Sequence, residues 1–353
     1  MTSVLVTGGG GFIGTHWCRT LADAGHTGIV LDCNPQAAPL PDNWRYVQGD
    51  VRDVALLRQL CATVSRVVHL AAAHHDAGIP AATYGDVNVN GTVALLDAMD
   101  HNGLTDLIFT SSVAVYGDMP GATEQTTPHP VSPYGITKLE AEHCIKAWTT
   151  RGAGRSAVVL RPAVVIGPGH FANMFSLMKQ IDSGLFVHVG AASNIKSLSS
   201  ARTVVAAGEW LREQALTPLQ VANVVSEPQL SSKTIINAIS KAFGRREPRL
   251  TIPLSLALIA AGAVQNGLQL IGRSTSISPA RVRKLFAAET LFVPSYLAAA
   301  GFKANDSTLS SLKEMAEWFL AGGRDKVRQV RYPPEHVTLH VEATVTTGQS
   351  CAS

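Results

Sequence analysis

Short apolar runs alternate with amphipathic segments over the first half of the chain. Apolar runs suited to buried strands occupy residues 3–7, 28–31, 66–70, 106–110 and 157–160. Segments with helical periodicity lie between them, at residues 12–24, 54–61, 87–99 and 134–149. Strands that alternate with helices pair in parallel, because each helix carries the chain back over the sheet. The pattern therefore predicts an α/β fold built on a doubly wound parallel sheet.

A glycine-rich turn follows the first predicted strand. Gly8, Gly11 and Gly14 are spaced for a tight turn, a close approach of the backbone to a pyrophosphate, and close packing of helix on strand. Asp32 ends the second strand about twenty residues later, where its carboxylate can accept hydrogen bonds from both ribose hydroxyls. Residues 33–36 contain no arginine that could bind a 2′-phosphate. The sequence therefore favours NAD over NADP as the cofactor.

Tyr134 and Lys138 form a second chemical feature. Residues four apart on a helix share one face, so the Lys138 cation can favour the phenolate of Tyr134 and make it a general base. Ser132 and Pro133 are suited to the N-cap and the first position of that helix. Ser112 lies upstream, just past the strand at 106–110, and offers a hydroxyl to the same chemistry. The three residue types are those that hydride transfer at an alcohol carbon can use.

These features together resemble the extended short-chain dehydrogenase/reductase superfamily, and within it the NAD-dependent epimerase/dehydratase family. The resemblance covers residues 3–322 and runs through segments 7–14, 49–53, 67–72, 88–92, 110–117 and 160–168. It implies a Rossmann sheet with a smaller C-terminal substrate-binding α/β lobe. We expect the NAD-binding domain at 1–167, with a return of the chain near 205–226. The substrate lobe is expected at 168–204 and 227–330, and a tail at 331–353.

The resemblance also implies roles for individual residues. Catalysis is assigned to Ser112, Tyr134 and Lys138. NAD contacts are expected from Gly8, Gly11, Phe12, Ile13, Gly14, Asp32, Asp50, Val51, Leu70, Ala71, Ala72, Asn88, Tyr134, Lys138 and Pro162. Substrate contacts are expected from Ser112, Asn173, Val189, Lys196 and Arg281, with Arg283 as a second cation for the pyrophosphate. Lys196 stands where many relatives have arginine, and a lysine cannot form the bidentate fork.

The residues beside the catalytic serine select among the reactions of the family. Dehydratases carry an Asp-Glu pair there and decarboxylating members a glutamate, whereas this chain has Ser112 and Val113. Both branches are therefore disfavoured. We expect NAD-dependent 4-epimerisation of a UDP-hexose or UDP-N-acetylhexosamine through a transient 4-keto intermediate. The alternative is an NAD(P)-dependent alcohol dehydrogenase or ketoreductase of the 3β-hydroxysteroid dehydrogenase kind. A dinucleotide sensor without catalysis is disfavoured because the catalytic residues are intact.

Composition narrows the possible partners and the compartment. The 353 residues are 46% hydrophobic with a net charge of +3, which fits a globular protein and is too mild for a nucleic-acid partner. Five cysteines without paired spacing suit reduced thiols in a cytoplasm. His74, His75 and Asp76 lack further ligands at suitable spacing, so we expect no metal. His69 ends a buried strand and is interpreted as structural. Relatives pair the helices that begin near residues 87 and 134, which implies a homodimer.

An uncharged segment at residues 254–272 is long enough for a membrane span. It contains Ser255, Gln265, Asn266 and Gln269 and lies within the substrate half of the family pattern. A helix buried in that lobe, or one lying against a membrane surface, is favoured over a spanning helix. Association with a membrane surface is kept open as a disfavoured alternative for the protein as a whole. The alternating pattern at 336–345 suits either an added edge strand or a disordered tail.

Overall fold

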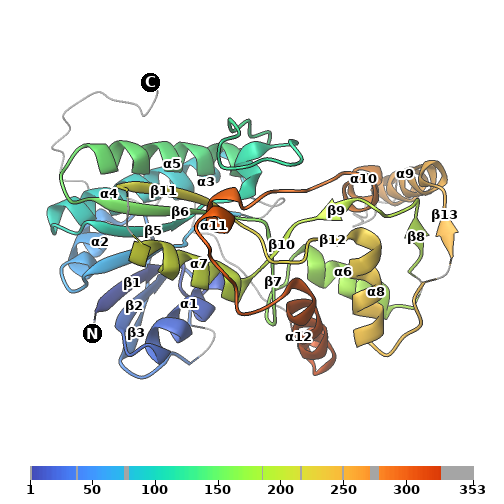
Figure 1. Ribbon diagram of the computed structural model, residues 1–353, viewed down its shortest axis with the longest axis horizontal. Helices are drawn as coiled ribbons and strands as arrows, with labels where there is room; N and C mark the ends of the chain where they lie inside the picture. Colours follow the sequence, from blue (N-terminus) through green and yellow to red (C-terminus); the bar gives the residue numbers. More distant parts are fainter. Residues whose placement is uncertain are drawn as a thin grey trace.

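Seven parallel strands form the main sheet of the computed structural model, which describes residues 2–36, 39–74, 79–184, 186–214, 217–248, 250–270 and 278–326. The strands are β1 (Ser3–Thr7), β2 (Thr27–Asp32), β3 (Trp44–Gln48), β4 (Arg66–His69), β5 (Asp106–Thr110), β6 (Ser156–Pro162) and β11 (Leu219–Val224). Their order is β11-β6-β5-β4-β1-β2-β3 (Figure 1). The chain winds outward from β1 in both directions, so the predicted doubly wound α/β fold is confirmed. The predicted tail at 331–353 lies outside the described residues.

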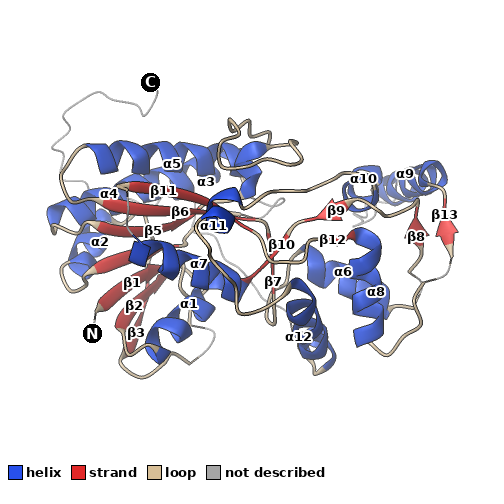
Figure 2. Ribbon diagram, in the orientation of Figure 1, coloured by secondary structure: helices blue, strands red, loops and turns tan. Residues whose placement is uncertain are grey.

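Helices cover both faces of this sheet (Figure 2). One face carries α2 (Val54–Cys61), α4 (Gly91–His101) and α5 (Pro133–Thr150). The other carries α1 (Phe12–Asp23), α7 (Ala201–Gln214) and α11 (Ser295–Ala299). The central strands are buried on both faces. Their sequences are therefore continuous apolar runs rather than alternating apolar and polar residues.

The helix predicted at 87–99 begins earlier and is irregular. It consists of α3 (Ala81–Tyr84), the π-helical turn η1 (Gly85–Asn90) and then α4. Pro80 precedes its first turn in extended conformation, where a proline is well tolerated. A π turn holds one more residue than an α turn, and such turns are common at functional sites. Asn88, one of the predicted cofactor residues, lies in this turn and is 1% exposed.

The substrate lobe has its own small core, to the right of the main sheet in Figure 1. Its helices are α6 (Asn173–Asp182), α8 (Ser232–Ala242), α9 (Leu254–Leu270), α10 (Pro279–Phe286) and α12 (Thr308–Leu320). Its strand pairs are β7 (Val164–Ile166) with β10 (Leu198–Ser200), β9 (Ile195–Lys196) with β12 (Leu230–Ser231), and β8 (His188–Val189) with β13 (Thr251–Ile252). Short 3₁₀ turns are η2 (Val113–Tyr116) in the main domain and η3 (Gly323–Asp325) after α12. Met178, Ile236 and Phe319 are fully buried where α6, α8 and α12 meet.

The chain passes between the two parts more than once. β11 returns to the main sheet beside β6, in register from Leu219 against Ala157 to Val224 against Pro162. α11 also returns, and Leu297 is 3% exposed in the core that contains α1 and α7. The predicted boundaries had assigned α11 to the substrate lobe. The two parts therefore share crossing segments rather than a single hinge.

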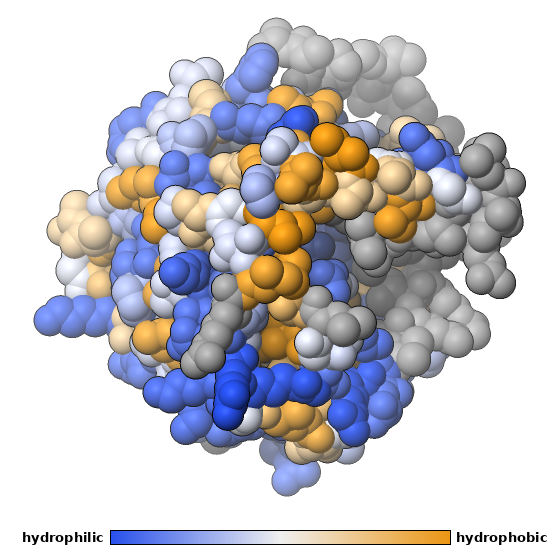
Figure 3. Space-filling view, turned by 90° about the vertical axis from the view of Figure 1, so that its right-hand side faces the viewer, coloured by the Kyte–Doolittle hydropathy of each residue, from blue (hydrophilic) through white to orange (hydrophobic). Residues whose placement is uncertain are grey.

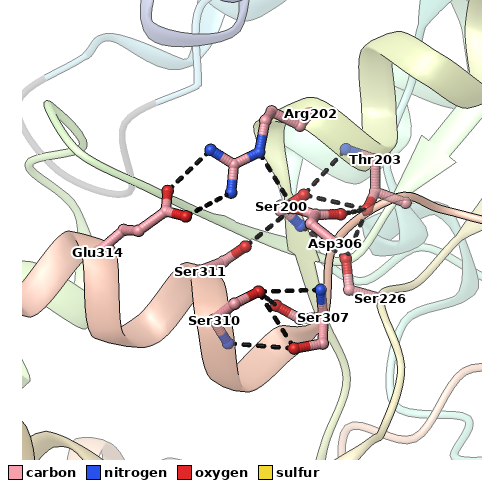
Figure 4. A network of polar contacts seen from close by, with 9 residues as sticks. All are labelled: Ser200, Arg202, Thr203, Ser226, Asp306, Ser307, Ser310, Ser311 and Glu314. Carbon is pink, nitrogen blue, oxygen red and sulfur yellow. Dashed lines mark hydrogen bonds and ion pairs between the residues drawn. The ribbon is translucent and has the colours of Figure 1, made fainter.

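A polar network joins α7 of the main domain to α12 (Figure 4). Arg202 donates to Glu314 at 2.7 and 2.9 Å and lies 3.4 Å from Asp306. Asp306 also accepts hydrogen bonds from Thr203 at 2.7 Å and Ser311 at 2.9 Å. Burial would raise the pKa of Asp306, but the hydroxyl hydrogen bonds and the Arg202 cation outweigh it, so the pKa is lowered. The charged carboxylate thus fixes α12 against the main domain.

Asp306→Asn should destabilise the protein, because the amide cannot accept the same set of hydrogen bonds or pair with Arg202. We expect the free energy of unfolding near neutral pH to fall by about 1–3 kcal/mol. A lowered pKa means that the carboxylate's contribution is complete above the unfolded-state value of about 4 and is lost as the pH falls through the folded-state pKa. Urea unfolding curves of wild type and variant should therefore differ at neutral pH and converge in acid.

Glu317→Gln is the matched control, since Glu317 lies on the same helix in an exposed pair with Lys313 at 3.7 Å. Such a pair contributes about 0–1 kcal/mol, so this variant should unfold like the wild type. Equal effects of the two substitutions would contradict the role given to Asp306.

Candidate active site

The glycine-rich turn lies at the carboxyl ends of β1 and β4. Gly8 has a φ of +68°, and a Cβ there would lie 2.6 Å from the backbone nitrogen of Ala71. A Cβ on Gly14 would lie 2.5 Å from the Cα of Gly9. No side chain fits between the turn, β4 and α1, so glycine is required at both positions. Since α1 begins at Phe12, directly after the turn, its unpaired amides lie at this point.

Asp32 ends β2 beside the same turn. Its side chain is largely buried and accepts a hydrogen bond from the backbone nitrogen of Asn34 at 2.9 Å. A Cβ on Gly10 would lie 3.0 Å from Asp32 Oδ2, which places the carboxylate against the turn. A turn free of side chains, helix amides and a carboxylate are the parts that hold a dinucleotide. The structure therefore fits the NAD predicted from sequence.

The other predicted cofactor residues follow or end strands of the main sheet. Carboxyl ends of parallel strands share one edge of the sheet, so these residues lie at the edge that carries the glycine turn. They are Phe12 and Ile13 after β1, Asp50 and Val51 after β3, Leu70, Ala71 and Ala72 after β4, and Pro162 at the end of β6. Asp50 already binds Arg52, whose Nη2 lies 2.8 Å from Oδ2. Direct contact of each of these residues with NAD stays a prediction.

Ser112 and Tyr134 belong to two turns that lie against each other where α5 begins. Ser112 follows β5 and caps η2, accepting a hydrogen bond from the backbone nitrogen of Ala114 at 3.1 Å. α5 starts at Pro133 behind the predicted serine cap. A Cβ on Gly135 would lie 2.5 Å from the carbonyl oxygen of Ala114, so the first turn of α5 lies directly on the turn that Ser112 caps. The two hydroxyl-bearing residues therefore belong to one corner of the site.

Lys138 lies beneath that corner, one turn along α5. It is 2% exposed, and its Nζ donates to the carbonyl oxygen of Thr110 at 2.7 Å. The Nζ also lies 4.5 Å from the centre of the Phe109 ring. Burial lowers the pKa of Lys138 to about 7, and the carboxylate of Glu142 partly opposes this shift. The charge on Lys138 therefore depends on Glu142, one further turn along the helix.

Glu142 is a functional candidate that the sequence analysis missed. Its carboxylate accepts hydrogen bonds from Ser111 Oγ at 2.5 Å and from Arg161 Nε at 3.0 Å, and it forms a buried ion pair with Arg161. Arg161 in turn donates to the hydroxyl of Tyr116, which donates to Asn223 Oδ1, both at 2.8 Å. The network ties α5 to the residue that follows β5 and to β6, η2 and β11. The only sequence signal was a glutamate four residues after Lys138, a spacing that is also common on exposed helices.

Asn88 supports the site from the π turn. Its Oδ1 accepts from the backbone nitrogen of Ala73 at 2.7 Å, and its Nδ2 donates to Thr137 Oγ1 at 3.0 Å. It thereby ties the loop after β4 to α5 next to Lys138. His69 is fully buried and hydrogen-bonded to Thr92 at 3.0 Å, and burial lowers its pKa to about 3. The neutral imidazole fits the structural role predicted for it.

The predicted substrate residues lie on the other lobe. Asn173 is the first residue of α6 and is exposed, whereas Val189 on β8 is buried. Lys196 Nζ donates to the carbonyl oxygen of Ala288 at 2.6 Å. Arg281 belongs to α10, but its side chain lies outside the described part of the structure. Contacts between these residues and a substrate stay predictions.

Comparison with known proteins decides the family. The model of the NAD-dependent epimerase/dehydratase family matches residues 4–203. The chain belongs to that family. The resemblance inferred from the sequence is thereby confirmed, and so is NAD as the cofactor, because the family is NAD-dependent and the glycine turn with Asp32 fits it.

One protein similar to this chain is the N-acetyl-α-D-glucosaminyl-diphospho-ditrans,octacis-undecaprenol 4-epimerase of Escherichia coli O157:H7. It is 32% identical over 308 residues, which cover 86% of this chain and 90% of the relative. The UDP-glucose 4-epimerase of Neisseria gonorrhoeae is 33% identical over 176 residues, about half of each protein at 45% and 52%.

Solved structures agree with the fold of the family. MoeE5 in complex with UDP-glucose and NAD has a TM-score of 0.70 at 25% identity, covering 91% of this chain and 99% of the other. The UDP-glucose 4-epimerase of Stenotrophomonas maltophila has a TM-score of 0.72 at 23% identity, covering 92% and 100%.

Gly8→Ala should abolish tight NAD binding, because the new methyl group would collide with the backbone of Ala71. We expect affinity for NAD to fall by about a hundredfold or more, measured by titration and by the NAD content of the purified protein. Gly25→Ala is the matched control, since Gly25 also has a positive φ, +80°, with nothing within 4 Å of its Cβ position. It carries the same backbone strain and should keep its NAD. Equal loss in both variants would show that strain, not the cradle, governs binding.

Glu142→Gln should shift the pH profile of turnover. Removing the carboxylate lowers the pKa of Lys138 further, so the ammonium is lost at a lower pH. The alkaline fall in turnover should move toward acid by about 1 pH unit, in kcat measured across pH on protein shown to be folded. Glu140→Gln, at an exposed position on the same helix, should leave the profile unchanged. An unmoved profile in Glu142→Gln would contradict its coupling to Lys138.

Proposed function

We propose that the protein is an NAD-dependent 4-epimerase that interconverts the C4 epimers of a hexose or N-acetylhexosamine carried on a diphosphate. The observation that carries this proposal is that the first turn of α5, which carries Tyr134, lies on the turn capped by Ser112, with Lys138 buried one turn further along the helix. Val113, next to the serine, is buried and apolar, where dehydratases and decarboxylating relatives need an acid. The site therefore has groups for removing and returning a proton at an alcohol but lacks the acid for elimination.

Tyr134, Ser112 and Lys138 have different roles in the proposed reaction. NAD held by the glycine turn and Asp32 would supply the hydride acceptor and donor for C4. Tyr134 takes the proton of the C4 hydroxyl and gives it back, while Ser112 donates a hydrogen bond to the same oxygen. Lys138 favours the phenolate of Tyr134 and offers its ammonium to the nicotinamide ribose. Turning the 4-keto sugar between the two steps exposes its other face, so the product differs only in configuration at C4.

Two carriers of the sugar fit this chemistry. A UDP-sugar is supported by the family pattern and by MoeE5, which was solved with UDP-glucose and NAD. A polyprenyl-diphosphate sugar is supported by the E. coli relative, which matches over 86% of this chain. Lys196, the cation expected to replace the arginine that relatives use for the nucleotide, donates instead to the carbonyl of Ala288. This contact favours the lipid-linked carrier.

We also propose that the enzyme acts as a homodimer in the cytoplasm, in carbohydrate biosynthesis. α4 and α5 would form the interface, and Val93 on α4 and Ile136 on α5 are 44% and 42% exposed. Burial raises the pKa values of the Cys18 and Cys61 thiols to about 12, which suits unreactive thiols in a reducing compartment.

Tyr134→Phe should lower turnover by about 10² to 10⁴-fold, because the phenyl ring cannot exchange the proton. The substrates to test are UDP-N-acetylglucosamine and polyprenyl-diphosphate-N-acetylglucosamine, with C4 epimers separated by chromatography. NAD content should stay close to the wild-type level, since the substitution removes one hydroxyl among many predicted NAD contacts and leaves the glycine cradle untouched.

The wild-type enzyme should interconvert epimers without net change in NADH absorbance. Formation of one NADH per turnover would instead identify the net alcohol dehydrogenase that the sequence left as the alternative. Unchanged turnover in Tyr134→Phe would remove this residue from the proposed mechanism.

A further inference from the structure

Helix α9 carries an apolar face that the described residues leave uncovered. Its exposed side chains include Leu256 at 57%, Ile259 at 70% and Val264 at 41%. On its other side Ala257 and Ala261 are 6% and 3% exposed, where α10 lies against it. Figure 3 views the molecule from this end and shows hydrophobic residues gathered over the upper part of the surface. The predicted burial of this segment in the substrate lobe is therefore true of one side only.

The length and charge of α9 indicate whether the helix could span a membrane or lie along its surface. Its 17 residues include no acidic or basic side chain. At about 1.5 Å per residue it is about 26 Å long, shorter than the hydrocarbon core of a bilayer at about 30 Å. Within the described residues, no helix is long and apolar enough to cross a membrane. An apolar helix face of this length suits a position along a lipid surface.

Cations without ion-pair partners among the described residues lie near the start of this helix and on the neighbouring α10. Arg246 and Lys233 are exposed and line a cavity of about 640 Å³, whose wall also contains Thr251 just before α9. Arg283 is exposed on the adjacent α10. Glu247, the acid in the same cavity, accepts a hydrogen bond from a neighbouring amide. Lysine and arginine beside an apolar helix complement the phosphates of an anionic lipid surface.

α9 also starts against β8, whose Val189 is one of the predicted substrate contacts. β13, which leads into the helix, pairs in parallel with β8. The backbone nitrogen of Gly190, just after β8, donates to the carbonyl of Ile252 at 2.9 Å. A Cβ on Gly190 would lie 3.8 Å from the Cβ of Leu254, the first residue of α9. The first turn of α9 therefore lies beside a predicted substrate contact.

We propose that α9 docks the enzyme on an anionic lipid bilayer. The apolar face of the helix lies among the acyl chains, and Lys233, Arg246 and Arg283 meet the lipid phosphates. This inference rests on the proposed 4-epimerase function and assigns its substrate as a sugar linked to a polyprenyl diphosphate. The polyprenyl chain stays in the bilayer while the diphosphate lies beside β8, so the sugar enters the site without extraction of the lipid.

The test is co-sedimentation of the full-length protein with vesicles. Wild type should bind vesicles of phosphatidylcholine mixed with phosphatidylglycerol, and bind pure phosphatidylcholine less. Leu256→Ser combined with Ile259→Ser should lower the partition coefficient by about tenfold or more, because two apolar side chains leave the interface. Arg246→Glu should remove the preference for the anionic lipid.

Leu309→Ser is the matched control, since Leu309 is 43% exposed on α12, away from α9. It should bind vesicles like the wild type. Epimerisation of polyprenyl-diphosphate-N-acetylglucosamine in vesicles should fall with the loss of binding in the α9 double variant, while the same substrate in detergent is turned over at the wild-type rate.

Other outcomes separate this inference from the proposed function. Epimerase activity without vesicle binding would overturn the docking surface and leave the enzyme assignment intact. Vesicle binding without any epimerase activity would overturn the function and the assigned substrate. A change of oligomeric state in the α9 double variant, seen by sedimentation velocity with vesicle binding unchanged, would make the face a contact between two copies and overturn the proposal.

Discussion

The buried ion pair between Glu142 and Arg161 is the interaction on which the site depends. Two charges removed from water are costly unless each finds partners, and here Ser111, Tyr116 and Asn223 complete the set. The network spans both the strands at the carboxyl edge and the helix that carries Tyr134. It fixes where α5 sits on the sheet. Tyr134 and Lys138 then occupy their positions because α5 does.

The Glu142 carboxylate affects both the position of α5 and the charge of Lys138. Lys138 is so deeply buried that its pKa is lowered to about 7, and Glu142 is the group that opposes this shift. A structural ion pair therefore also controls the fraction of lysine that is protonated at neutral pH. Tyr134, the proposed general base, is positioned by the helix and influenced electrostatically by Lys138. Loss of the carboxylate would affect both, because one group serves them together.

The two lobes are joined to each other by residues other than those of the candidate active site. Crossing segments, the α11 return and the Arg202–Asp306–Glu314 network fix α12 against the main domain. At the far end, α9 has a packed side and an exposed apolar side. A lobe anchored at one end and apolar at the other can present a substrate held at a surface to chemistry at the sheet edge. The proposed lipid-linked carrier rests on this arrangement.

The local residue pattern determined the parallel sheet, the glycine cradle, Asp32, and the pairing of Tyr134 with Lys138. Each rests on short-range physics: apolar periodicity, the conformations open only to glycine, and the spacing of side chains along one helix. Sequence did not indicate the role of Glu142, the π turn around Asn88 or the return of α11. Those depend on partners such as Arg161, Thr137 and Val224 that are far away along the chain, and only the folded structure brings them together. The exposure of α9 was likewise decided by tertiary structure. The sequence of an uncharged helix is the same whether neighbouring elements cover it or leave it exposed.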